Sequence, residues 1–320
     1  MNTLVSGASG LIGTALVERL LGGGGTGGTG GTGGTGTVTR LIRNGPSAAG
    51  SVSGVTDVSW MPDRGQVDVA ALDRAGPFDA VVHLAGAGIG DRRWSPKRKQ
   101  EILDSRTDST RLLVDTLLRL ADRPPVLVSA SAVGFYGDRG DEVLTEDSPT
   151  GTGFLAEVCR AWEAAAQPAA DNGIRTVHLR TGIVLSRHGG AWGKQLPLFR
   201  VGLGGRMGPG DQYRSWITLE DEIGVVLHCL TSDDLSGPVN ATAPSPATDA
   251  ELAKAVGTVL HRPTVMVVPA PALRLVLGAE MANELILGGQ RVLPAVLTER
   301  GYAFAHPDLH EAVRSVLLAT

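Results

Sequence analysis

The first thirteen residues constrain the fold of this 320-residue chain more than any other feature. An apolar stretch runs into G-A-S-G-L-I-G at residues 7–13, and a helical pattern follows over residues 14–21. Gly7 permits a tight turn, Gly10 lets a ligand approach the backbone, and Gly13 lets the helix pack closely against the strand. The helix also presents free N–H groups to an anion. This order of strand, turn and helix predicts a site for the pyrophosphate of a dinucleotide, although the spacing is G-x-x-G-x-x-G and not G-x-G-x-x-G.

Strand and helix patterns alternate over the first 180 residues. We expect strands at residues 2–6, 37–42, 56–60, 79–84, 126–131 and 174–180, and helices at 14–21, 67–73, 96–121 and 154–172. Alternating helices and apolar strands are typical of a parallel sheet covered on both faces. The pattern therefore predicts an α/β fold, a Rossmann-type doubly wound parallel sheet.

The rest of the chain is organised differently. A Gly/Thr tract at residues 22–36 carries no side chains able to form a core, which predicts a flexible surface insert. After residue 180 the pattern loosens, with further helices expected at 219–230, 249–261 and 309–318. We predict an NAD(P)-binding Rossmann domain over residues 1–180. A smaller C-terminal substrate lobe, partly interleaved with it, is expected over residues 181–320.

Composition excludes several classes of protein. The net charge of -4 and pI near 6.0 disfavour a nucleic-acid binder. Two cysteines, Cys159 and Cys229, suit a reducing compartment and so a cytoplasmic protein. No apolar run is long enough to span a membrane, and no His/Cys/Asp/Glu cluster has metal-ligand spacing, so we expect no membrane contact and no metal. The composition does not decide whether the chain forms a homodimer.

The end of the second expected strand indicates which dinucleotide binds. NAD-selective folds place an acid there, whereas arginine suits the 2′-phosphate of NADP. No acidic residue occurs between this strand and Asp57, whereas two arginines, Arg40 and Arg43, stand near the end of the strand. We therefore expect NADP rather than NAD, with Arg43 as the first candidate and Arg40 as the second. A solvated strand end is the alternative.

Further motifs carry a family resemblance, at residues 79–86, 88–106, 129–137, 179–185, 215–217 and 287–294. Together they resemble the extended short-chain dehydrogenases/reductases of the NAD(P)-dependent epimerase/dehydratase type. They are most similar to an atypical subfamily, sugar-nucleotide-epimerase-like, whose C-terminal part is a domain of unknown function. The likeness covers nearly the whole chain except residues 22–36.

The resemblance implies a set of cofactor contacts. Residues of the glycine motif would hold the pyrophosphate, namely Gly7, Ser9, Gly10, Leu11, Ile12 and Gly13. Arg43 would meet the 2′-phosphate. The adenosine side would be lined by Leu84, Ala85 and Gly86, and the nicotinamide would lie beside Ser129, Ala130 and Ser131.

The chain departs from this family at its catalytic pair. The family at large uses Tyr-x-x-x-Lys, in which the tyrosine exchanges a proton and the lysine lowers its pKa. None of the four lysines here follows a tyrosine at that spacing, and Phe154 and Val158 stand at the expected positions. The atypical subfamily also lacks the pair, so the acid or base must be another residue.

Several residues are candidates for that role. Ser131 could polarise a substrate oxygen, or simply form a hydrogen bond at its strand end. Tyr136 could act as an acid near the mouth of the site, or pack. Glu157 is expected to be solvated, Cys159 to be a small core residue and His83 to be a packed histidine.

Arginine and tryptophan residues suggest an anionic substrate. The basic residues around Trp94 could hold a nucleotide-sugar diphosphate with the indole stacking on a base, or form a solvated helix start. Arg106 could also take an anion. Other candidates for substrate contacts from the second lobe are Arg180, Arg214 and Trp216.

These features predict an NADP-binding, epimerase/dehydratase-like oxidoreductase. Its small-molecule substrate is expected to be anionic, possibly a nucleotide sugar. The alternative is a non-catalytic NADP-binding sensor or scaffold, which the missing Tyr-x-x-x-Lys pair favours.

Overall fold

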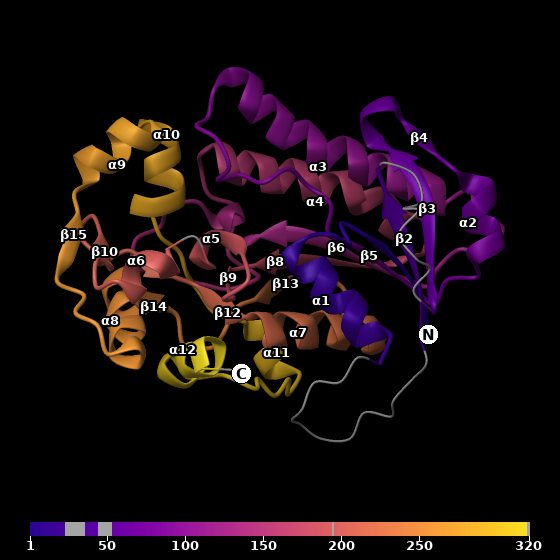
Figure 1. Cartoon of the computed structure of the whole chain (residues 1–320). Helices are drawn as coiled ribbons and strands as arrows, with labels where there is room; N and C mark the ends of the chain where they lie inside the picture. The colour runs from indigo at the N-terminus through magenta and orange to yellow at the C-terminus, as the bar shows by residue number, and fades with distance from the viewer. Residues whose placement is uncertain (23–35, 44–52, 194, 319–320) are drawn as a thin grey trace.

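One eight-stranded sheet organises the molecule (Figure 1). The computed structural model describes residues 1–22, 36–43, 53–193 and 195–318. The expected flexible insert lies outside the described residues, except for Gly22 and Gly36. In spatial order the strands are β13 (Gly237–Ala241), β8 (Arg175–Thr181), β6 (Val126–Ala132), β5 (Ala80–His83), β1 (Asn2–Ser6), β2 (Thr37–Ile42), β3 (Val55–Met61) and β4 (Gln66–Val67). All neighbours are parallel except β3 and β4.

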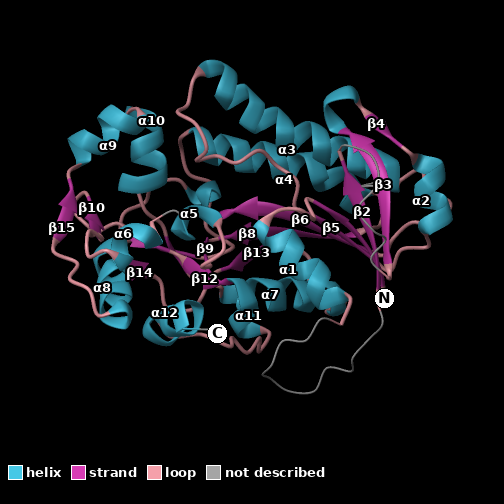
Figure 2. Cartoon of the chain, viewed as in Figure 1, coloured by secondary structure: helices cyan, strands magenta, loops and turns pink. Residues whose placement is uncertain are grey.

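Helices cover both faces of this sheet (Figure 2). On one face lie α2 (Val69–Ala75), α3 (Pro96–Leu117) and α4 (Phe154–Asp171), and on the other α1 (Leu11–Leu20), α7 (Leu219–Thr231) and α11 (Ala295–Glu299). Successive strand residues point to opposite faces. Leu4 thus packs with Leu113 of α3, while Val5 packs with Leu16 of α1. The alternation buries two separate apolar layers, and the prediction of a Rossmann-type doubly wound fold is confirmed.

The order of the strands defines a ligand crevice. The chain leaves β1 toward β2 on one side and later returns to place β5 on the other. At such a switch point the loops after two adjacent strands diverge, and open α/β sheets bind ligands there. The glycine-rich turn follows β1 at this point.

The remaining elements gather at one end of the sheet (Figure 1). Their core includes Trp216, Leu252 and Val313. The helices are α5 (Gly190–Gly193), α6 (Leu196–Arg200), α8 (Asp249–Leu260), α9 (Ala270–Leu277), α10 (Ala279–Ala282), a π-helix (Asn283–Leu287) and α12 (Leu309–Leu318). The short strands are β7 (Val143–Leu144), β9 (Ile183–Leu185), β10 (Gly205–Met207), β11 (Tyr213–Arg214), β12 (Trp216–Thr218), β14 (Ala247–Thr248), β15 (Met266–Val268) and β16 (Arg291–Val292). Two short 3-10 helices cover Pro62–Arg64 and Val133–Tyr136.

The C-terminal part is interleaved with the sheet. Both β13 and α7 come from beyond residue 180, yet β13 extends the sheet and α7 covers one face of it. The sequence pattern did not identify β13, and the domain boundary at residue 180 stays a prediction. Within the described residues, no helix has the length and hydropathy that a membrane span requires.

A buried carboxyl lies under the end of β8. Glu222 of α7 is 0% exposed, and its Oε1 accepts a hydrogen bond from Thr181 Oγ1 at 2.8 Å. No described residue pairs with Oε2. Burial raises the pKa of Glu222 from its ordinary value of 4.5 to about 8.

This shift predicts a pH-dependent stability. Between pH 4.5 and about 8 the folded chain binds the Glu222 proton and the unfolded chain does not. The free energy of unfolding therefore falls as pH rises through this window, by up to about 1.4 kcal/mol per pH unit. Glu222→Gln stays neutral, so it should remove that slope in denaturant melts at several pH values. Glu157→Gln, an exposed change on α4, should leave the slope intact; equal slopes in all three proteins would contradict the assignment.

Candidate functional site

The glycine turn brings β1, α1 and the end of β5 into close contact. Gly7 has a φ of +71°, and a Cβ there would lie 2.6 Å from the carbonyl carbon of Leu84. A Cβ on Gly13 would lie 2.2 Å from the oxygen of Gly7. At Gly10 the nearest atom would be the Gly7 oxygen, 3.3 Å away. Gly7 and Gly13 are therefore required by the fold, whereas a Cβ on Gly10 would make one tight contact, with the Gly7 oxygen.

The start of α1 lies at Gly10. Gly10 is the N-cap residue, and no side chain caps the helix. No acidic residue stands in the first turn, and Ser9 and Gly10 are exposed. An uncapped helix N-terminus beside a glycine is suited to a phosphate group. The residues at this turn therefore fit the pyrophosphate of a dinucleotide, and Leu11, Ile12 and Gly13 form the first turn of the helix.

The two arginines of β2 have different surroundings. Arg40 Nε and Nη2 donate to the two carboxylate oxygens of Asp57 at 2.7 and 2.9 Å. Its charge is thereby neutralised by the neighbouring strand. Arg43 is exposed just beyond β2, and no described residue forms an ion pair with it. Of the two, Arg43 is the one with its cation available to a ligand.

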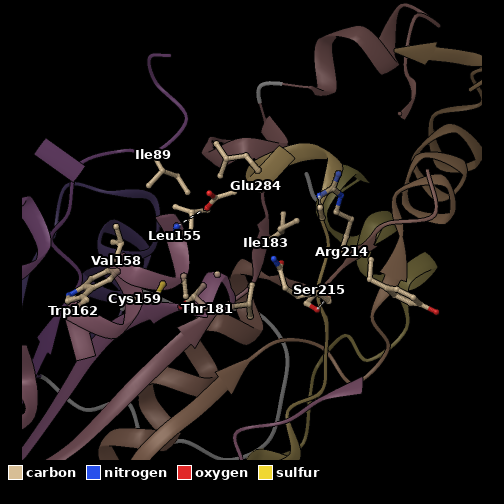
Figure 3. A pocket seen from close by; sticks show the side chains of 18 of the residues that line it. Ile89, Leu155, Val158, Cys159, Trp162, Thr181, Ile183, Arg214, Ser215 and Glu284 are labelled. Atoms are coloured by element: carbon tan, nitrogen blue, oxygen red, sulfur yellow. Dashed lines mark hydrogen bonds between the residues drawn. The ribbon is translucent and has the colours of Figure 1, made fainter. Parts of the chain in front are cut away.

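A cavity of about 170 Å³ opens beyond the carboxyl ends of β6 and β8. In Figure 3, Leu155, Val158, Cys159 and Trp162 form one side, Arg214 and Ser215 lie opposite, and Glu284 lies between them. The wall is mostly apolar and joins the sheet to the C-terminal elements. The remaining lining residues are Ile89, Arg106, Ala132, Val133, Gly134, Thr181, Gly182, Ile183, Tyr213, Leu285, Gly288 and Gln290.

Arg106 is a partly buried cation in this wall. Its Nη1 donates to the oxygens of Ala87 at 2.9 Å and Ile102 at 3.1 Å, and its guanidinium lies 4.9 Å over the Trp162 ring. No described carboxylate forms an ion pair with it. Burial lowers the pKa of Arg106 to about 10, which still leaves it charged at neutral pH.

Ser131 and Tyr136 belong to a buried hydrogen-bond network. Ser131 Oγ donates to Glu163 Oε1 at 2.7 Å, and Arg180 Nε and Nη2 pair with the same carboxylate at 2.9 and 3.0 Å. Arg180 Nη1 donates to the Tyr136 hydroxyl, which donates to Asn240 Oδ1 at 2.7 Å. Tyr136 is 0% exposed, and burial raises its pKa. Neither hydroxyl, nor Arg180, lies on the described wall of the cavity.

The other residues that were expected to contact the substrate lie in different environments. Arg214 lines the cavity, but its Nε pairs with buried Asp249 at 3.1 Å. Trp216 is 0% exposed in the C-terminal core. Trp94 packs edge-on against Phe154, and its Nε1 donates to the oxygen of Ile89. Trp94 therefore supports the cavity through Ile89 and does not reach the wall itself.

Three further expectations concern single residues. His83 is enclosed between the hydroxyls of Ser6 and Thr110, and burial lowers its pKa to about 3, which confirms a packed histidine. Cys159 is buried, and burial raises its pKa to about 12, so the thiol stays neutral. Glu157 is exposed, as expected.

Glu284 was not identified from the sequence. Its two carboxylate oxygens accept hydrogen bonds from the N–H groups of Phe154 and Leu155 at 2.9 and 2.8 Å. Gly153 precedes them with a φ of +104°, and a Cβ there would lie 3.1 Å from the carboxylate. Glu284 thus caps α4 from the C-terminal part of the chain. No local pattern signals a cap that is 130 residues away.

The glycine geometry predicts two different outcomes for alanine substitution. Gly13→Ala forces α1 away from Gly7, so we expect the free energy of unfolding to fall by about 1–3 kcal/mol. Gly10→Ala makes one tight contact, so it should cost less stability than Gly13→Ala; it should weaken NADPH binding at least about tenfold, because its methyl group occupies the space for the phosphates. Chemical melts and fluorescence titrations measure the two effects. Unchanged NADPH binding by Gly10→Ala would contradict the phosphate assignment.

The network predicts a structural role for the Tyr136 hydroxyl. Tyr136→Phe leaves Asn240 Oδ1 without its donor and removes one acceptor from Arg180 Nη1, which should cost about 1–3 kcal/mol of stability. The dissociation constant for NADPH should not change. A variant with wild-type stability that has lost only turnover would instead favour Tyr136 as the proton donor.

Comparison with known proteins places the whole chain in one group. The profile of the NAD dependent epimerase/dehydratase family matches residues 3–241, and a domain of unknown function (DUF1731) matches residues 268–316. The Epimerase family protein Mb2239 of Mycobacterium bovis is 41% identical over 310 residues, covering 97% of this chain and 95% of that protein.

Two solved structures are similar over nearly all of this chain. The human epimerase family protein SDR39U1 (isoform2), solved with NADPH, is 32% identical with a TM-score of 0.85, and each chain is covered completely. The nucleoside-diphosphate sugar epimerase from Corynebacterium glutamicum is 33% identical with a TM-score of 0.74, covering 99% of this chain and 58% of that one. This chain belongs to the NAD dependent epimerase/dehydratase family and has its NAD(P)-binding oxidoreductase fold.

Proposed function

We propose that the chain is an NADP-dependent oxidoreductase acting on a small anionic molecule. The observation that carries this proposal is the cavity beyond β6 and β8, which lies at the same edge of the sheet as the glycine turn. NADP would supply hydride transfer when it is bound. The chain would hold its pyrophosphate at the turn and hold the substrate in the cavity.

The choice of NADP rests on the end of β2. Arg43 is exposed and without an ion pair among the described residues, whereas Arg40 is neutralised by Asp57. A free guanidinium suits the extra phosphate of NADP. The NADPH in the human relative's structure supports the same choice. Leu84, Ala85 and Gly86 are the proposed adenosine contacts, since they follow β5 beside the turn.

The substrate side rests on Arg106. Arg106 lines the cavity and forms no ion pair with a described carboxylate, which supports an anionic ligand. A nucleotide sugar is one form of such a ligand, and the name of the Corynebacterium glutamicum relative supports it. We assign Ser131 and Tyr136 to positioning, because their hydroxyls are held by Glu163, Arg180 and Asn240. A cavity with an available cation favours an enzyme over a non-catalytic sensor.

The environment of the protein is part of the proposal. Cys159 and Cys229 are both buried free thiols, which supports action in a reducing, cytoplasmic compartment. A homodimer is compatible with the exposed apolar side chains of the C-terminal part, such as Val265, Leu275 and Val276.

A fluorescence titration with NADPH and NADH tests the cofactor assignment. We expect NADPH to bind at least about tenfold tighter, a difference of about 1.4 kcal/mol. Arg43→Ala should lose this preference while its affinity for NADH is unchanged, because NADH has no 2′-phosphate. An unchanged preference would overturn the role of Arg43. No binding of either nucleotide to the wild type would overturn the proposed function itself.

A further inference from the structure

The size of the cavity limits its occupant. Its volume is about 170 Å³, whereas pockets for drug-sized ligands span roughly 300–1,000 Å³. An engineered apolar cavity of about 150 Å³ takes up benzene. One six-membered ring or a short branched chain therefore fills this space. A nucleoside diphosphate with its sugar is larger than this space, so most of it would lie outside the cavity.

The chemistry of the wall limits the occupant further. Leu155, Val158 and Ile183 offer aliphatic surface, and Trp162 offers a ring. Cys159 adds a thiol that burial keeps neutral. Burying an apolar body here is favourable by about 25 cal/mol for each Å² removed from water. The side of the wall formed by α4 is thus suited to a hydrocarbon body, while polar side chains such as Ser215, Gln290 and Glu284 also line the cavity.

Arg106 differs from the two buried arginines near the cavity. Arg180 is paired with Glu163, and Arg214 is paired with Asp249. Arg106 has only carbonyl partners and the Trp162 ring, and both carbonyls accept from Nη1. Among the described residues nothing accepts a hydrogen bond from Nε or Nη2. These two nitrogens are therefore free to donate to an anionic group of a ligand.

The guanidinium is also held in place before any ligand arrives. Ile102, one turn earlier on α3, and Ala87 fix Nη1 from two directions. Gly86 allows this position, since a Cβ there would lie 3.2 Å from the Arg106 Cζ. A fixed, planar guanidinium with two free donor groups matches the two oxygens of a carboxylate.

We infer that the substrate is a small organic acid, with its carboxylate on Arg106 and an apolar body of about one ring in the cavity. This inference rests on the proposed function and narrows its substrate class. It separates the chain from enzymes that bind a whole nucleotide sugar. The negative charge and the apolar body are recognised by different parts of the wall, so they can be tested separately.

Calorimetric titration of the NADPH-saturated protein tests the inference with three probes. Benzoate carries both recognised features, benzamide has the same shape without the charge, and UDP-glucose is the large alternative. We expect benzoate to bind at least about tenfold tighter than benzamide, and UDP-glucose to bind more weakly than benzoate. Arg106→Gln should abolish the preference for benzoate. Arg111→Gln, an exposed change on the same helix, should retain it.

The remaining results distinguish the possible failures. Arg106→Lys keeps the charge without the planar group, so it should retain part of the preference and confirm that the protein remains folded. Tighter binding of UDP-glucose, or equal binding of benzoate and benzamide, would overturn the inference while NADPH binding still supports the proposed function. Loss of NADPH affinity in Arg106→Gln would also overturn it, because Arg106 would then contact the cofactor. Failure of NADPH to bind the wild type would instead refute the proposed function.

Discussion

The contact of the glycine turn with the end of β5 is the constraint on which the site depends. Gly7 lies against Leu84, and Gly13 lies against Gly7, so the positions of β1, β5 and α1 are fixed together. Any side chain at either glycine would separate them. This contact sets the start of α1, whose N–H groups face the crevice. Strands β6 and β8 belong to the same sheet as β1 and β5, and the cavity opens beside their carboxyl ends.

Charge pairing divides five arginines around the proposed site into structural and available groups. Arg40, Arg180 and Arg214 each meet a carboxylate, and the two buried ones also bind backbone or hydroxyl oxygens. Removing a partner from such a buried pair leaves an uncompensated charge, which ties these residues to stability. Arg43 and Arg106 have no such partner among the described residues. The two available cations lie at the end of β2 and on the cavity wall, the two places where an anionic ligand group is expected.

Local patterns predicted the sheet well because its signals are local. Every strand expected from the sequence is present within one residue of its predicted ends, and Ser95 caps α3 as Pro96 suggests. The edge strand β13 was missed, because the pattern had already loosened in that region. Long-range partners were also missed: Asp57 for Arg40, Glu163 for Arg180 and Glu284 for α4. One sequence does not reveal which charged groups meet across 17 to 130 residues.

A crystal structure of this chain with NADPH would test the central claim most directly, namely that one crevice joins the glycine turn to the cavity. We expect the pyrophosphate at the start of α1, the 2′-phosphate at Arg43, and the nicotinamide beside residues 129–131, directed toward the cavity that the substrate occupies. The Arg106 guanidinium should remain open beside it. A nicotinamide directed away from the cavity, or NADPH bound elsewhere, would contradict the claim.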